Sequence, residues 1–156
     1  MNPSVEIIEF ELRYRERFME LNMEWIEKYF SVCDADIEQL SSPEKIIKEG
    51  GKVFFAKYDD EIVGTCALVW YNDEWLELIK MAVTEKYQGL KIGKQLIQKS
   101  IESAKELGAK SLILETADEL TNAIALYEKS GFVRFELPKA HFTYNRCVFA
   151  MKLDLI

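Results

Sequence analysis

The sequence predicts an α/β (α+β) protein with about seven strands and four helices, in the order β-α-α-β-β-β-α-β-α-β-β. Three observations predict this class: short β-rich runs joined by tight polar connections, longer runs with apolar residues at helical spacing, and the mixing of the two along the chain. No repeat, low-complexity tract or linker rich in Pro, Gly or Ser interrupts the 156 residues. We therefore expect one domain over residues 1–156.

The N-terminal part predicts one strand and two helices. Residues 5–10 form a short apolar run typical of a strand, and the apolar residues between Phe18 and Tyr29 recur at helical spacing. Ser42-Pro43-Glu44 is typical of a helix start, because proline is favoured at the first helical position. Gly50-Gly51 ends this second, short helix.

Three strands are predicted next, over residues 52–58, 61–70 and 75–83. Asp59-Asp60 joins the first two and Asn72-Asp73 lies between the second and third. Connections this tight predict antiparallel hairpins.

The C-terminal half alternates helices and strands. Apolar residues at helical spacing predict a long helix that begins at Ile92 and ends at Gly108. A short strand over residues 111–115 and a helix over residues 121–129 follow. Two strands, over residues 132–137 and 147–155, complete the predicted sheet.

The composition excludes several function classes. With 20 basic and 27 acidic residues the formal charge is -7, which argues against binding to nucleic acid or to an anionic membrane surface. The three cysteines are widely separated and show no C-x-x-C spacing, so we expect no metal site. No apolar stretch is long enough to span a bilayer, and we expect a cytoplasmic protein.

The segment most informative about function is the connection between the strand ending at Val83 and the long helix. Free amides and the helix dipole converge at such a connection and favour an anion. Lys86, Lys91 and Lys94 add local positive charge to an acidic chain. The glycines alone leave a plain strand-to-helix connection open, and neither a P-loop nor a dinucleotide-binding fingerprint is present.

Gln88-Gly89-Leu90-Lys91-Ile92-Gly93 resembles the acetyl-CoA-binding motif Q/R-x-x-G-x-G/A of the GNAT N-acetyltransferases, with Lys91 at the position of the first motif glycine. The stretch from Asn122 through Tyr127 to Gly131-Phe132 is similar to the later N-x-x-A…Y-x-x-x-G-F element of that family. The resemblance implies the GNAT fold, a mixed and strongly twisted central sheet of about seven strands flanked by four helices. It also implies transfer of an acetyl group from acetyl-CoA to an amine.

The resemblance further implies roles for individual residues. Amides from Gln88 to Lys94 would hold the coenzyme's diphosphate, and Met81 and Val83 would bond its pantetheine arm as an added strand would. Tyr127 matches the family's general acid, although a tyrosine on a helix can also be a core anchor. Asn122 would bond the coenzyme, or would simply occupy the first turn of its helix.

Glu77 matches the position at which some relatives carry a general base. Simple alternation places Glu77, Ile79, Met81 and Val83 on one face of the strand, and Lys80 on the other. If the face shared with these apolar residues is buried, the pKa of Glu77 rises toward neutrality. An exposed, solvated carboxylate, and water as the base, stay open.

The acceptor is expected to be an amine on a small molecule or peptide, because no motif identifies it. Two alternatives to an acetyltransferase stay open: a non-catalytic acyl-CoA-binding sensor or interaction module, and an enzyme that uses a longer acyl chain. A homodimer also stays open.

Overall fold

The computed structural model describes residues 4–137, 147 and 149–156. The strands are β1 Val5–Glu9, β2 Lys52–Tyr58, β3 Glu61–Trp70, β4 Trp75–Val83, β5 Ser111–Thr116, β6 Val133–Phe135 and β7 Phe149–Asp154. The helices are α1 Arg15–Tyr29, α2 Asp34–Ser41, α3 Pro43–Lys48, α4 Ile92–Glu106 and α5 Thr121–Lys129, with 3-10 turns η1 Leu12–Tyr14 and η2 Glu85–Tyr87. No described helix combines the length and apolar character that crossing a bilayer requires.

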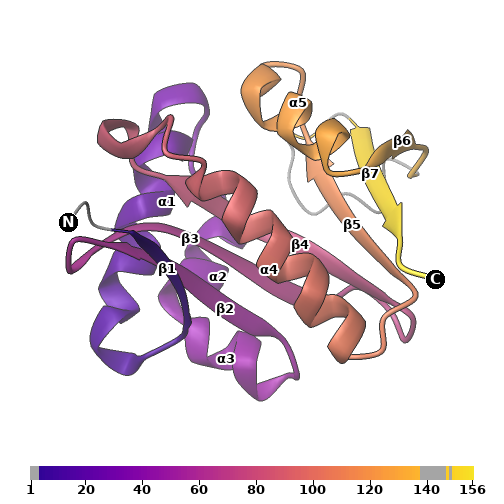
Figure 1. The fold of residues 1–156 in the computed structure, drawn as a ribbon, viewed down its shortest axis with the longest axis horizontal. Helices are drawn as coiled ribbons and strands as arrows, with labels where there is room; N and C mark the ends of the chain where they lie inside the picture. The colour runs from indigo at the N-terminus through magenta and orange to yellow at the C-terminus, as the bar shows by residue number, and fades with distance from the viewer. Residues whose placement is uncertain (1–3, 138–146, 148) are drawn as a thin grey trace.

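All seven strands form one mixed sheet in the order β1-β2-β3-β4-β5-β7-β6. Among the described strands only β4 and β5 run parallel, and their pairing extends from Trp75 opposite Ser111 to Glu77 opposite Ile113. β4 continues for six residues beyond Glu77, to Val83, without a further partner on β5 among the described residues. The two halves of the sheet therefore separate at this point (Figure 1).

Two apolar clusters cover the two faces of the sheet. One lies under α4 and includes Leu76, Leu78 and Leu96; the other lies under α1 to α3 and includes Phe18 and Ile79. Figure 1 shows α4 crossing one face and α1 to α3 lying behind the other. Leu96 and Phe18 are fully buried, as their helical spacing requires.

The predicted fold class and the mixed sheet are confirmed, and β2, β3, β4 and α5 have the predicted bounds. One helix, α2, was not predicted. Its buried residues are Asp36 and Leu40, so it lacks an apolar stripe, and its start is capped by a hydrogen bond from the Cys33 amide to Asp36 Oδ2 of 3.1 Å. Residue 148, within the last predicted strand, and most of the connection before it lie outside the described residues.

Candidate active site

The predicted diphosphate site is an uncapped helix start. The first backbone bond of α4 runs from the Gln95 amide to the Lys91 carbonyl, at 3.2 Å, so the amides of Ile92, Gly93 and Lys94 have no partner within the helix. No side chain caps this end and its first turn has no acidic residue. Lys91 and Lys94 are exposed around it, which makes the turn positively charged.

Lys91 has a backbone conformation that explains why the family motif has a glycine at this position. Its φ is +60°, in the left-handed region that favours glycine, and Gly89 two residues earlier has a φ of +96°. The exposed lysine adopts the turn that a glycine would adopt, with its side chain directed to solvent. Gly93 has a different role, since a Cβ there would lie 3.0 Å from Leu126 Cδ2 on α5, and the Leu126 side chain would have to shift.

The loop between β4 and α4 is bound to α1 by hydrogen bonds and an ion pair. Glu24 on α1 accepts hydrogen bonds of 3.2 Å from the Thr84 hydroxyl and from the Glu85 amide. Lys28 pairs with the Glu85 carboxylate. The helix α1 therefore positions the strand end that precedes the predicted diphosphate site.

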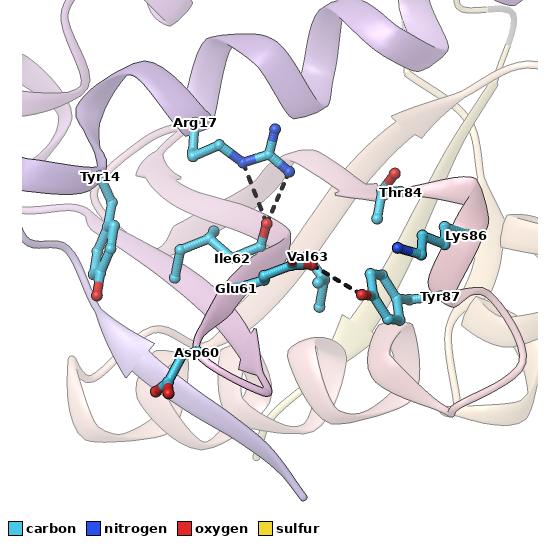
Figure 2. A pocket seen from close by; sticks show the side chains of 9 residues that line it. All are labelled: Tyr14, Arg17, Asp60, Glu61, Ile62, Val63, Thr84, Lys86 and Tyr87. Atoms are coloured by element: carbon cyan, nitrogen blue, oxygen red, sulfur yellow. Dashed lines mark hydrogen bonds between the residues drawn. The ribbon is translucent and has the colours of Figure 1, made fainter. Parts of the chain in front are cut away.

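Tyr87 links the same loop to the β2–β3 hairpin by a hydrogen bond. Its hydroxyl donates to Glu61 at 2.9 Å, beside an open pocket of about 450 Å³ (Figure 2). The pocket is lined by Tyr14, Arg17, Asp60, Glu61, Ile62, Val63, Thr84, Lys86 and Tyr87. None of the predicted catalytic or coenzyme-binding residues lines it, so it is not the predicted active site.

A β-bulge in β4 makes the predicted alternation wrong. Thr65 pairs with Ala82 but Ala67 pairs with Ile79, so the single residue Cys66 lies opposite both Lys80 and Met81. Lys80 has a φ of +55° at the bulge. The extra residue reverses the face of the sheet on which each side chain of β4 lies beyond the bulge.

The bulge therefore divides the four residues that were expected to share a face. Ile79 packs in the cluster under α1 to α3, together with Ala82. Met81 and Val83 pack instead against the cluster under α4. Glu77 lies on the same face as Ile79, because no bulge separates these two residues. Met81 and Val83 lie on the other face of the sheet.

Glu77 is buried, with 5% of its surface exposed, so the solvated-carboxylate interpretation is wrong. Burial raises its pKa well above the ordinary value, and a hydrogen bond with Glu115 and the charge of Glu115 raise it further. The nearby charge of Lys80 acts in the opposite direction. A carboxylate with a raised pKa binds a proton more readily than an ordinary carboxylate, as a general base requires.

Lys80 is held by a buried ion pair. Its ammonium donates to Asp36 Oδ1 on α2, and the two side chains are 1% and 0% exposed. The other oxygen of Asp36 also lies 3.3 Å from the Cys33 thiol. This pair fixes α2 against the bulge of β4.

Tyr127 lies on the α4 side of the sheet, opposite to the side of Glu77. It is the one buried residue of α5, 8% exposed, while Ile124 and Leu126 are only partly buried. Its ring contacts Phe132 at 5.8 Å between centroids. Burial raises the pKa of its hydroxyl, so the group stays protonated at neutral pH.

The structure thus places Tyr127 with Met81 and Val83 on the α4 side of the sheet, and Glu77 on the α1 side. Asn122 is exposed in the first turn of α5. Sequence reasoning missed Glu115 and the Lys80–Asp36 pair. A signal for Glu115 exists, since it is a carboxylate within an otherwise apolar strand end. Among the residues described, no group of three or more His, Cys, Asp and Glu could hold a metal.

Relatives of the chain are named N-acetyltransferases. YvbK of Bacillus subtilis (strain 168), named an uncharacterized N-acetyltransferase, is 34% identical over 101 residues, which are 62% of this chain and 65% of that protein. YjgM of Escherichia coli (strain K12), named in the same way, is 31% identical over 110 residues, or 68% of this chain and 64% of that protein. The chain therefore matches just under two thirds of the length of each of these two curated relatives.

Solved structures match nearly the whole chain. A GNAT-family acetyltransferase from Staphylococcus aureus Mu50 has a TM-score of 0.89 at 26% identity and covers 98% of this chain and 100% of its own. The putative acetyltransferase yncA from Salmonella typhimurium, solved with its cofactor acetyl-CoA, has a TM-score of 0.79 at 16% identity, with 98% and 95% covered. The family model described as "Acetyltransferase (GNAT) family" matches residues 15–132, from α1 through the end of α5, and on this match the chain belongs to the GNAT acetyltransferase family.

Proposed function

We propose that this chain is an N-acetyltransferase that transfers the acetyl group of acetyl-CoA to an amine of a small molecule or peptide, by direct attack in a ternary complex. The observation that carries the proposal is the free edge of β4 beyond Glu77, with the uncapped start of α4 at its far end. The N-acetyltransferase names of its relatives and a neighbouring structure that contains acetyl-CoA support the same reaction.

In this proposal the coenzyme lies along the free edge. The amides from Gln88 to Lys94 hold the diphosphate, and the backbone of Met81 and Val83 pairs with the pantetheine arm as with an added strand. Asn122, at the exposed start of α5, bonds the same molecule. Lys91 and Lys94 attract the phosphates by charge.

The two proposed catalytic groups lie on opposite faces of the sheet, Glu77 at the last pair between β4 and β5 and Tyr127 on α5. Glu77 on the α1 side accepts a proton from the acceptor nitrogen, so that a neutral amine attacks the thioester carbonyl. Tyr127 on the α4 side donates its proton to the departing sulfur, and its raised pKa keeps that proton available. The acceptor and the coenzyme therefore approach from different faces.

Tyr127→Phe tests the chemical step. General acid catalysis contributes ~10²–10⁴-fold, so kcat should fall by that factor while acetyl-CoA affinity stays close to that of the wild type. Release of the coenzyme thiol, measured with polyamines, amino acids and peptides as acceptors, gives the rate. Tyr14→Phe, in the pocket on the far side of the loop, is the matched control. An unchanged kcat in Tyr127→Phe would remove the acid role.

One observation favours the alternative of a non-catalytic acyl-CoA sensor, namely Lys91 at the position of the family glycine. The two functions differ in turnover. Thermal protection by acetyl-CoA together with thiol release supports the enzyme, and protection without release from any amine supports the sensor. We further propose that the chain acts in the cytoplasm as one domain over residues 1–156.

A further inference from the structure

A second carboxyl group lies next to the proposed base. Glu77 is opposite Ile113 in the parallel pairing of β4 and β5, and Glu115 follows two residues later. Side chains two residues apart on a strand share a face, so Glu115 lies on the same face as Glu77, at the point where the strands separate. Oε2 of each carboxyl is buried.

The contact between these carboxyls requires a proton. Glu77 Oε2 accepts no hydrogen bond from a donor among the described residues, and an ionised carboxylate has no hydrogen to donate. The register nevertheless places the two carboxyls side by side on one face, and a hydrogen bond with Glu115 is among the causes that raise the pKa of Glu77. They can bond only when one of them is protonated, as in other buried carboxyl pairs that share one proton.

The described cations nearest the pair are each matched by an aspartate: Lys80 by Asp36, and Lys152, opposite Ile113 on β7, by Asp154. Lys80 acts on Glu77 from the same strand, but Asp36 on α2 neutralises that lysine. Tyr71 directly follows β3. Burial raises the pKa of its hydroxyl most, and the charges of Glu77 and Glu115 raise it further. With one shared proton the pair has a charge of −1, and with none it has −2.

We propose that Glu77 and Glu115 act as one unit that takes the proton of the acceptor amine and holds it between two oxygens, with Glu77 as the base and Glu115 as a positioning residue. The inference rests on the proposed function. The unprotonated pair is the active form. An N–H bond of the acceptor breaks and an O–H bond forms on Glu77, while the C–N bond forms, the C–S bond breaks and the sulfur takes the proton of Tyr127. Solvent then takes the proton from the pair and reprotonates Tyr127.

The dependence of kcat/KM on pH tests this unit. Its acid limb reports the pH at which the free enzyme loses the shared proton. Glu115→Gln removes the neighbouring charge and the second carboxyl group, so the acid limb should move to lower pH by about one unit or more. The plateau of kcat/KM at high pH should stay within a few-fold of the wild-type value. Glu115→Asp should return the limb toward its wild-type position. Glu77→Gln should lose the plateau.

Glu106→Gln, on the exposed last turn of α4, is the matched control and should leave the limb in place. An unmoved limb in Glu115→Gln would overturn the proposal. Loss of the plateau in Glu115→Gln, with a plateau kept in Glu77→Gln, would also overturn it, because Glu115 would then be the base.

A second readout does not depend on turnover. Titration of the glutamate side-chain carbons by NMR should show Glu77 titrating at lower pH in Glu115→Gln than in the wild type. An unmoved titration of Glu77 would refute the shared proton even in a protein with full activity. A shifted titration of Glu77 in a protein that acetylates no amine would instead refute the proposed function and leave the pair established.

Discussion

The buried ion pair between Lys80 and Asp36 gives the sharpest prediction about stability. Asp36→Asn keeps the shape of the side chain but removes its charge, which leaves the Lys80 ammonium, 1% exposed, beside a neutral amide. Removing one partner of a buried pair costs about 3–5 kcal/mol. The amide oxygen that replaces the carboxylate oxygen still accepts a hydrogen bond from the ammonium, so we expect the lower end, about 3 kcal/mol.

Urea denaturation of the coenzyme-free protein measures this cost. With a slope of about 2 kcal/mol per molar urea, the midpoint should fall by about 1.5 M. Replacing both partners with apolar residues, Asp36→Leu with Lys80→Met, should restore most of the loss, because no isolated charge is left buried.

The exposed pair between Lys110 Nζ and Glu74 Oε1, at 3.3 Å, provides the control. Both side chains are more than half exposed, and Glu74→Gln should cost at most about 1 kcal/mol. A loss in Asp36→Asn no larger than in Glu74→Gln would refute the reasoning, because Lys80 would then not depend on the charge of Asp36.

Three further predictions concern the loop and the base. Lys91→Gly should be more stable than Lys91→Ala by about 1 kcal/mol in thermal unfolding, because only glycine avoids the left-handed penalty; equal stabilities would contradict this. Tyr87→Phe removes the hydrogen bond to Glu61 and should weaken acetyl-CoA binding up to about fivefold in calorimetry with kcat unchanged; a fall in kcat alone would argue against a role in positioning the loop. The raised pKa of Glu77 means that the folded chain retains a proton that the unfolded chain releases near the ordinary value of 4.5. The stabilisation by protonated Glu77 is thus complete below that pH and is lost as the pH rises through the pKa of Glu77 in the folded chain. Urea denaturation at several pH values should show this loss in the wild type and not in Glu77→Gln. A parallel loss in both proteins would assign it to another group.

Local patterns in the sequence were sufficient for the elements of the sheet. β-rich runs bounded by Asp59-Asp60 and by Asn72-Asp73 predicted β2, β3 and β4 with their observed bounds, because hairpin strands depend on neighbouring residues. The start of α4 was also readable, since glycines and a change of period occur together there. The family resemblance came from the same short motifs.

The tertiary structure alone decided the faces of β4 and the partners of Glu77. The bulge at Lys80 depends on the register against Thr65 and Ala67 of β3, and one inserted residue reverses every side chain that follows it. Asp36 and Glu115 reach this site from α2 and β5, elements that lie far from β4 in sequence and meet it only through packing. Burial and long-range contacts set the charge of a site, whereas strand and helix patterns depend on near neighbours along the chain.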